Sequence, residues 1–503
     1  MAKKTGKAEE VLEEIFNTVK DITKDSELFI GTNTGLEYIT WIDRNNEVRT
    51  DAIKSESFKY RILMECIAVE DKLYENKFIK RIVDYVLAHA LTSKNKKTIY
   101  SRIAKIGDEI IYNLNNEARQ YVVVTAENPY YENEIEVSQK ACAFISNSLM
   151  GAQVMPIIKK EHNLYDLLSP FLNMDDDSKK LLTVCLVAWF IQDIPKAVIL
   201  LQGEQGSGKT FLTSLIQKIV DPVTHETLNS PETKEDLGVA LATHYVMAVD
   251  NITDLPKGVS DLLCQASTGG SMLKRTKYSN FDASVVSFKN CVLLNGIAIE
   301  NARLDLRDRI VGFELPTLNK KYVSAKAIEE EFDKKLPYIL GQIFSVLSQA
   351  MQIYDDLEYV ESPRLIDFFT WGRAIATVVF GSDKEFIDIF LRNKGFVFED
   401  LVQQDPLAYA MKLYLESLTK FPCKANSTEL YKKLMDIART NHINMSSENW
   451  VSSSQELSNK LKKLIPAFRG MGYSINVDSS NKSNGVRYIK FGKTDEANAE
   501  AVA

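Results

Sequence analysis

The sequence has 503 residues, of which 45% are hydrophobic and 26% charged, an ordinary composition for a soluble globular protein. Its length predicts about three domains, and its net charge of −7 restricts any nucleic-acid-binding face to a local patch. The six cysteines form no C-x-x-C pair and do not cluster with the five histidines, which predicts no zinc, no disulfides and a reducing, cytoplasmic compartment. The N-terminus has no signal-peptide core. The longest apolar run, 181–191, is too short for a membrane span of about 20 residues and predicts a buried helix.

The first 160 residues carry no recognisable chemical motif, and we expect an accessory domain. Alternating and helical apolar patterns predict its elements. These are a helix over 8–24, strands within 28–53, two helices within 56–92, a hairpin from Thr98 to Leu114 with a first strand over 99–104 and a turn at Gly107-Asp108, and a strand over 121–124.

A short apolar run over 197–201, a glycine-rich loop and a helical pattern over 211–216 follow one another in the middle of the chain. The loop has the pattern G-x-x-x-x-G-K-T and consists of Gly203, Glu204, Gln205, Gly206, Ser207, Gly208, Lys209 and Thr210. Strand, loop and helix in this order are the context of a P-loop. Glycines allow backbone N–H groups and a helix N-terminus to converge on phosphate oxygens. We therefore predict an ATP site, with Lys209 on the terminal phosphates and Thr210 as a Mg²⁺ ligand.

Asp250 ends the buried strand expected over 245–250, where its carboxylate can help to hold Mg²⁺. Asn251 follows it, at a position where many ATPases place the glutamate that activates water. Two interpretations stay open: Asn251 positions the water, or a nearby carboxylate, Glu204 or Asp254, activates it.

Asn295 ends a further apolar run, 291–295, and is a candidate sensor of the γ-phosphate; the alternative is an ordinary Asn-Gly turn. Three arginines, Arg303, Arg307 and Arg309, precede a strand expected over 310–315. An arginine presented to a neighbouring subunit would stabilise the charge that develops in phosphoryl transfer. The alternative is a solvated charge run.

A basic cluster lies between the strands that end at Asp250 and Asn295. It consists of Lys274, Arg275 and Lys277, the hairpin cations. A hairpin in the pore of a ring would bring them to DNA phosphates. The alternative is an ordinary surface hairpin.

Strands alternate with helices from residue 161 to 324, which argues for a parallel α/β sheet. The expected boundaries are a helical lead-in over 164–192 with a helix start at Asp175, a P-loop helix that stops at Asp221-Pro222, a short strand near 226–229 and a helix opened by Ser230-Pro231. Residues 325–420 are expected to be mostly helical, forming a lid and a connector.

Residues 421–490 hold 11 Lys and Arg against five Asp and Glu, a net charge of +6. We expect a helix over 428–439, a second helix opened by a capping box at Ser453–Glu456, and strands over 473–477 and 486–490. Helices followed by two strands predict a winged helix. Its candidate DNA contacts are Lys460, Lys462, Lys463 and Arg469 on the second helix and Arg487 and Lys490 on the wing. The alternative is a solvated surface.

Seven short pieces of the chain carry a family resemblance. They are Pro170–Asn173, Leu186–Trp189, Gly203–Thr210, Val249–Asn251, Ala266–Gly270, Leu294–Ile297 and Asp305–Arg309. The stretch that contains them resembles the AAA+ ATPases of phages, pathogenicity islands and cassette chromosomes, which act as replication initiators and DNA helicases. These are similar to superfamily 3 and minichromosome maintenance helicases.

The resemblance implies a role for several residues and a fold for the whole chain. An Asp-Asn pair such as Asp250-Asn251 is usual there, Asn295 would be sensor 1, Arg309 the arginine finger, and Arg364 a sensor 2 that contacts ATP. The expected fold is an α/β AAA+ core, a parallel sheet flanked by helices, and the resemblance implies that the chain assembles as a hexameric ring around DNA. Its expected domains are a mixed α+β N-terminal domain over 1–160, the core over 161–324, a helical lid and connector over 325–420, a winged helix over 421–492 and a disordered tail over 493–503.

Three functions compete. The first is a ring-forming, ATP-driven DNA helicase and replication initiator of a mobile element. The second is an ATPase switch that loads or remodels a partner protein without unwinding. The third is an ATP-regulated winged-helix DNA-binding protein. Arg309 and the hairpin cations favour the first.

Overall fold

The computed structural model describes residues 24–493 with short gaps, together with positions 13, 17 and 20. The gaps are 44–47, 71–74, 134–135, 138, 226–227, 230, 232, 276–282, 301–303, 319–323, 359, 361–363, 448–449, 478–481 and 484–485. Most of the predicted helix over 8–24, the predicted tail apart from Lys493, Lys277 and Arg303 therefore lie outside the described residues.

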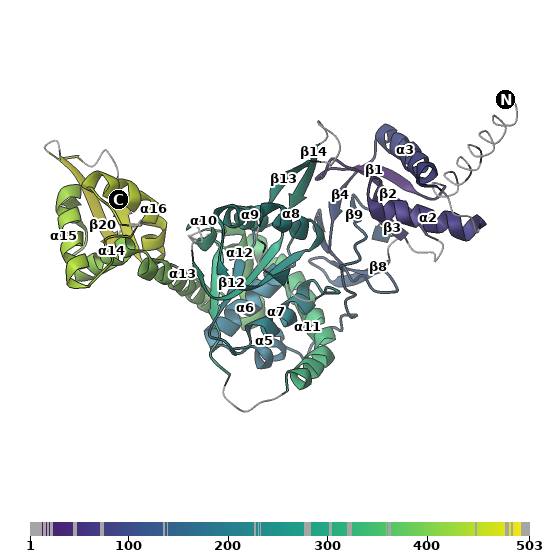
Figure 1. Cartoon of the computed structure of the whole chain (residues 1–503). Coiled ribbons are helices and arrows are strands. Elements are labelled where there is room, and N and C mark those ends of the chain that lie inside the picture. Colours follow the sequence, from purple (N-terminus) through teal and green to yellow (C-terminus); the bar gives the residue numbers. More distant parts are fainter. Residues whose placement is uncertain are drawn as a thin grey trace, which may run out of the picture.

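Two sheets form the N-terminal part of the chain (Figure 1). The first has the order β3-β2-β1-β4-β9 and packs against two helices, and the second has the order β5-β6-β7-β8. The elements are β1 (Glu27–Gly31), β2 (Glu37–Ile42), β3 (Val48–Ala52), α2 (Glu56–Glu70), α3 (Asn76–Thr92), β4 (Lys96–Tyr100), β5 (Ile103–Ile106), β6 (Glu109–Asn113), β7 (Gln120–Val124), β8 (Pro129–Asn133) and β9 (Cys142–Phe144).

The hairpin predicted between Thr98 and Leu114 is partly wrong. Its turn at Gly107-Asp108 is confirmed, since β5 and β6 pair across it. Its first strand, however, breaks at Ser101-Arg102 into β4 of the first sheet and β5 of the second. The break carries the chain from one sheet to the other and places the Arg102 side chain in the interior, fully buried.

A five-stranded parallel sheet, with the order β11-β12-β15-β10-β16, forms the centre of the molecule and confirms the predicted sheet type. Its strands are β10 (Val198–Gln202), β11 (Leu228–Asn229), β12 (Val246–Asp254), β15 (Cys291–Glu300) and β16 (Ile310–Glu314). Alternate residues of β10 enter two different cores: Ile199 and Leu201 one, Val198 and Leu200 the other. A strand covered on both faces is continuously apolar, which is why the sequence revealed it.

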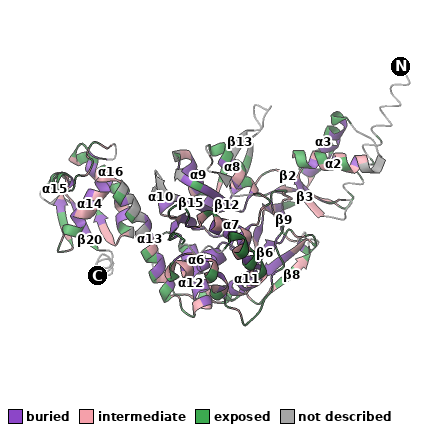
Figure 2. Cartoon of the chain, turned by 60° about the horizontal axis from the view of Figure 1, so that its bottom comes forward, coloured by how far each residue is buried: buried purple, intermediate pink, exposed green. Residues whose placement is uncertain are grey.

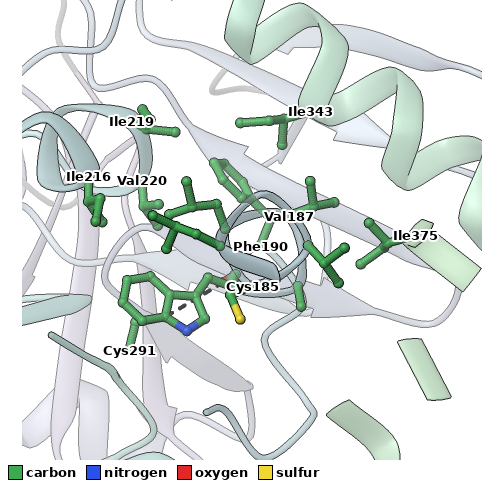
Figure 3. Close-up of a cluster of buried hydrophobic side chains, with 14 of the residues drawn as sticks. Cys185, Val187, Phe190, Ile216, Ile219, Val220, Cys291, Ile343 and Ile375 are labelled. Carbon is green, nitrogen blue, oxygen red and sulfur yellow. Dashed lines mark hydrogen bonds between the residues drawn. The ribbon is translucent and has the colours of Figure 1, made fainter. Parts of the chain in front are cut away.

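Helices cover both faces of this sheet. The larger core contains α5 (Leu164–Leu168), α6 (Asp176–Ala188), α7 (Lys209–Val220), α11 (Ala325–Ile353) and α12 (Ile366–Phe380), and the smaller one α8 (Lys234–Thr243) and α9 (Lys257–Thr268). Figure 3 shows Val187, near the end of α6, and Phe190, just beyond that end, among side chains of α7, α11 and α12. The buried helix predicted within 181–191 is confirmed over 181–188, and Asp175 is its N-cap.

The predicted start of the next helix at Ser230-Pro231 is wrong. Helix α8 begins at Lys234, and its N-cap is Thr233, whose Oγ1 accepts the N–H of Asp236 at 3.1 Å. A threonine with an acidic residue in the first turn is an equally good start signal. Pro231 lies before the cap.

The long helix α13 (Lys384–Gln404) connects the centre to a C-terminal unit (Figure 1). That unit contains α14 (Pro406–Ser417), β17 (Cys423–Asn426), α15 (Ser427–Thr440), α16 (Ser454–Gly470), β18 (Tyr473–Asn476), β19 (Lys482–Ser483) and β20 (Val486–Lys493). The two predicted helices and two predicted strands are confirmed, while β17, which pairs with β20, was not predicted. Side chains of α14 belong to the same buried cluster as those of α15 and α16. Figure 2 shows these three helices together in the C-terminal unit. We therefore propose that this domain begins near residue 406 rather than at 421.

The Ser453 hydroxyl caps α16 by accepting the N–H of Glu456 at 3.2 Å. The return bond of the predicted capping box goes one residue further back, because Glu456 accepts the N–H of Ser452 at 2.8 Å. Within the described part of the chain, no helix is both long enough and apolar enough to cross a membrane.

Candidate active site

The P-loop lies at the carboxyl edge of the central sheet, between β10 and α7. Gly206 and Gly208 have φ of 85° and 88°, and Gly208 is the N-cap of α7. Gly203 must be glycine because a Cβ there would lie 2.5 Å from the carbonyl oxygen of Leu315. These conformations are accessible to glycine at little cost and leave the first N–H groups of α7 without intrahelical partners, as phosphate binding requires.

Two side chains of the loop fit a phosphate ligand. The Lys209 ammonium lies over the loop and donates to the carbonyls of Gly203 at 2.8 Å and Glu204 at 2.9 Å. The Ser207 hydroxyl is buried and has no hydrogen-bond partner among the described residues. A buried hydroxyl is usually bonded, so this one fits a ligand group at the loop.

The two predicted Mg²⁺ ligands are adjacent. The Thr210 hydroxyl, in the first turn of α7, donates to Asp250 Oδ1 on β12 at 3.3 Å. Asp250 is 9% exposed, and Thr210 is exposed beside it. A hydroxyl and a carboxylate at this separation match the hard oxygen ligands that Mg²⁺ takes alongside its waters and a phosphate.

Asn295 ties this pair to the neighbouring strand. Its Oδ1 accepts the backbone N–H of Asn251 at 2.9 Å, and its Nδ2 donates to Thr213 Oγ1 on α7 at 3.0 Å. The side chain is fully buried. Because β15 lies between β10 and β12, one amide fixes the P-loop helix relative to the residue after Asp250.

Asn295 and Gly296 do not form the turn considered as the alternative. They lie within β15, which continues to Glu300. Gly296 is required because a Cβ would lie 2.1 Å from the carbonyl oxygen of Ile252. The pair therefore marks a close approach between two strands rather than a reversal of the chain.

The residue after Asp250 has an unusual backbone. Asn251 has φ of 55°, at an irregularity in the pairing of β12 with β15, and its side chain is exposed. Asparagine tolerates this left-handed conformation better than most residues. Of the two carboxylates considered for water activation, Glu204 is exposed and accepts from the Thr317 hydroxyl at 3.4 Å. The Asp254 side chain lies outside the described residues.

Arg309 lies at the opposite edge of the sheet. It precedes β16, which runs parallel to β10 with Ile310 beside Val198 and Glu314 beside Gln202. A five-residue strand spans on the order of 16 Å, so this edge is about a strand length from the P-loop. The Arg309 guanidinium donates through Nη1 to the carbonyl of Asp305, and its buried Nε has no partner among the described residues.

Arg364, predicted to contact ATP, also lies at the Arg309 edge and not at the P-loop edge. Its Nη1 is 3.0 Å from Asp308 Oδ2 and 3.3 Å from Asp305 Oδ1. Burial lowers the pKa of this guanidinium and the two carboxylates raise it, with a net rise. Arg307, at the end of α10 (Leu304–Arg307), is buried.

The predicted DNA contacts fall in two places. Strands β13 (Gly270–Arg275) and β14 (Ala283–Phe288) form the predicted hairpin, with Lys274 and Arg275 at the end of β13 nearest the turn. On α16, the side chains of Lys462, Lys463 and Arg469 are exposed and Lys460 is half-buried. Lys490 is exposed on β20, whereas the Arg487 side chain lies outside the described residues.

Sequence reasoning missed two groups that support this site. Thr213 donates to the Lys209 carbonyl at 3.0 Å while accepting from Asn295. Arg102 and Asp221 form a buried ion pair at 2.9 Å, and Asp221 also accepts the N–H groups of Tyr245 and Val246, at the start of the Asp250 strand. Two features of the sequence could have indicated these groups: Thr213 is a polar residue on a mostly apolar face of α7, and Arg102 is a lone arginine within an apolar run.

Two family models match the chain. Residues 166–370 match the model described as the actinomycete integrative conjugative element replication protein, AICE_RepA, and residues 407–500 match the AICE RepA C-terminal domain. Together they span more than half of the chain. A search of curated proteins found no match.

Solved structures that align with the chain are distant. One titled as the active helicase Cch of SCCmec type IV is 11% identical, with 94% of this chain and 93% of that chain covered and a TM-score of 0.44. The C-terminal region of NrS-1 is 13% identical over 94% of this chain and 96% of that chain, with a TM-score of 0.37. The JCV helicase is 17% identical over 44% of this chain and 70% of that chain, with a TM-score of 0.21.

These TM-scores lie below 0.5, so the solved structures support no statement about the fold or activity of this chain. The two family models cover the P-loop, Asp250, Asn295 and Arg309 in one match and the C-terminal unit in the other. The chain therefore belongs to the AICE RepA family of replication proteins, which serve integrative conjugative mobile elements.

Proposed function

We propose that the chain is an ATP-dependent DNA helicase and replication initiator that forms a ring on DNA. The observation that carries this proposal is the division of the candidate ATPase residues between two edges of one sheet. The P-loop, Thr210, Asp250 and Asn295 lie at the carboxyl edge, and Arg309 with Arg364 at the amino edge. The site would be complete when the carboxyl edge of one copy of the chain faces the amino edge of a second copy.

The carboxyl edge would bind ATP with Mg²⁺. Backbone N–H groups of the loop and Lys209 would hold the phosphates, and Thr210 and Asp250 would hold the metal ion, which supplies charge stabilisation on the phosphate oxygens when bound. Asn295 would orient the backbone at Asn251, and with it the attacking water.

The amino edge would supply the arginine finger. Guanidinium is always charged and presents a fork of donors, so it suits the charge that develops on phosphate oxygens. We assign this role to Arg309, whose Nε is unpaired among the described residues. Arg364 would contact ATP on the neighbouring chain as well, after exchanging its carboxylate partners for phosphate.

DNA would meet the hairpin cations in the pore of the ring and the exposed lysines of α16. In that C-terminal unit, which we propose to be a winged helix, α14, α15 and α16 precede the β18–β20 ribbon. A protein that neutralises phosphates loses affinity steeply as salt rises, so both surfaces predict salt-dependent binding.

Strand separation on a forked DNA tests the proposal. Wild-type protein should separate the strands when ATP and Mg²⁺ are present, and the Lys209→Ala variant should not. Replacing the hairpin cations with alanine should leave DNA-independent hydrolysis within about twofold of the wild-type rate. It should abolish unwinding, because the hairpin would no longer bind DNA phosphates and could not move the strand.

The second candidate, a switch that loads or remodels a partner protein, is favoured by the same ATP site but needs no grip on DNA. Hydrolysis without strand separation by the wild-type protein, under conditions in which it assembles on the fork, would support that candidate and contradict the helicase. Unwinding at the wild-type rate by the hairpin variant would remove the hairpin from the mechanism.

A further inference from the structure

Strand β16, which follows Arg309 directly, is an edge strand of the central sheet, and helix α13 packs against it. Among the residues that the structure describes, β16 is the last strand of the central sheet, so no strand pairs with its outer N–H and C=O groups there. The Asn393 side chain bonds both groups of Gly312: its Nδ2 donates to the carbonyl at 2.6 Å, and its Oδ1 accepts the N–H at 3.1 Å. One amide on α13 thus replaces a strand partner and fixes β16 to the helix.

The next residue of α13 brackets Arg309 itself. The Lys394 ammonium donates to the carbonyl of Asp308 at 2.9 Å and to the carbonyl of Ile310 at 2.7 Å, the residues on either side of Arg309. Lys394 is 3% exposed, and burial lowers its pKa to about 8. Burying an ammonium is costly unless it is well bonded, so the side chain is held firmly in this position.

About one turn after Lys394, α13 joins the hydrophobic core that also contains α10, the helix just before Arg309. Val397 of α13 and Leu306 of α10 belong to one buried cluster, and both are nearly inaccessible to solvent. The hydrogen bonds of the Asn393 and Lys394 side chains to the backbone and this shared hydrophobic core therefore link α10 and the start of β16 to a single helix.

The same helix enters the C-terminal unit. Val402 is fully buried in the core of that unit, together with side chains of α14 and α16. From Lys394 to Val402 the helix rises about 12 Å, without a break in α13. Helix α16 also packs directly against both α13 and α10. The helix with the exposed lysines and the turn with Arg309 are thus direct neighbours.

We propose that Asn393 and Lys394 are positioning residues for Arg309. When the C-terminal unit moves on DNA, α13 moves with it and shifts the position of Arg309, the arginine finger. This inference rests on the proposed function. An arginine that acts across a subunit junction needs its guanidinium within hydrogen-bond distance of the phosphate, and a shift of about 1 Å can cost on the order of 100-fold in rate. The contacts of α13 control that distance without touching ATP.

The test uses full-length Lys394→Met, which keeps the length of the side chain and removes its charge and donors. We expect DNA-stimulated ATP turnover to fall at least about tenfold, by the sensitivity of rate to placement. The KM for ATP and the affinity for forked DNA should change less than about twofold, because the P-loop and the lysines of α16 are intact. Lys384→Met, an exposed lysine on the same helix, is the matched control and should behave like the wild type.

Mixing experiments separate a displaced finger from a general defect. Lys394→Met retains its P-loop and loses its finger, so adding Lys209→Ala, which retains its finger, should restore turnover. Adding Arg309→Ala should restore none, since neither protein then supplies a finger. Recovery with Arg309→Ala, or full DNA stimulation in Lys394→Met, would overturn the inference.

Two further outcomes are decisive. If Lys394→Met does not fold, Asn393→Ala replaces it in the same assays, because it removes the Gly312 bonds without affecting a buried charge. If Arg309→Ala itself hydrolyses ATP at the wild-type rate, the finger assignment in the proposed function fails, and the positioning role fails with it. If Arg309→Ala is inactive but Lys394→Met and Asn393→Ala both keep full DNA-stimulated turnover, the positioning role is contradicted and the finger assignment stands.

Discussion

Two inactive variants should restore each other if the ATPase site forms between copies of the chain. Lys209→Ala removes the cation from the carboxyl edge of the sheet, and Arg309→Ala removes it from the amino edge. The register of β16 on β10 sets these edges about a strand length apart, on the order of 16 Å. In one chain, Arg309 therefore cannot reach phosphates held by its own P-loop.

The expected recovery follows from counting junctions. Arg309→Ala should turn over ATP about 10³–10⁵-fold more slowly than the wild type, the range for loss of a finger supplied in trans, and Lys209→Ala should be inactive because it lacks the cation on the terminal phosphates. In a head-to-tail ring formed at random from equal amounts, about one junction in four combines an intact P-loop with an intact finger. Turnover should therefore reach up to about a quarter of the wild-type value if junctions act independently.

The assay is steady-state phosphate release at constant total protein across mixing ratios, with co-assembly measured by crosslinking. The curve should rise to a maximum at equal amounts and fall to both ends. Arg392→Ala, an exposed arginine on α13, is the matched control and should retain wild-type turnover. Mixed assemblies that stay as inactive as the parents at every ratio would refute the shared site, and Arg303 would be the next residue to test.

Three further perturbations follow from the same contacts. Thr213→Val should leave Asn295 Nδ2 buried without its partner, so steady-state kinetics should show a lower kcat with little change in the KM for ATP. Denaturant titration should show that the free energy of unfolding falls by about 1–3 kcal/mol. Arg102→Ala should lower the free energy of unfolding by about 3–5 kcal/mol, because it leaves the Asp221 carboxylate buried without its partner; an unchanged thermal midpoint would contradict this. Removal of residues 405–503 should weaken DNA binding and flatten its salt dependence while basal hydrolysis persists, and equal salt slopes for both proteins would exclude a DNA role for the C-terminal unit.

The sequence predicted the parts of the site that are local in the chain. The P-loop is eight consecutive residues whose glycine spacing follows from its backbone geometry. The strands of the central sheet are continuous apolar runs because both of their faces are covered. Asp250 and Asn295 were found because each is the first polar residue after such a run.

Contacts between distant segments left no comparable pattern. Arg102 and Asp221 are 119 residues apart, and Asn393 lies 81 residues after its partner Gly312. Strand β17 is four residues long and mixed in polarity, so no alternation revealed it; β20 supplies its pairing. The position of Arg364 was beyond sequence reasoning for the same reason, since its partners on the Arg309 turn lie more than fifty residues earlier.

The direction of the sheet explains why the candidate residues separate as they do. In a parallel sheet every strand points to the same edge; the P-loop follows β10 there, and Asp250 and Asn295 lie on β12 and β15 level with the last residues of β10. Residues that precede strands gather at the other edge, as Arg309 does. Helix α13 reaches that second edge from the C-terminal unit through Asn393 and Lys394. The proposed nucleotide site and the proposed arginine finger thus lie at different edges, and α13 links the edge with Arg309 to the C-terminal unit.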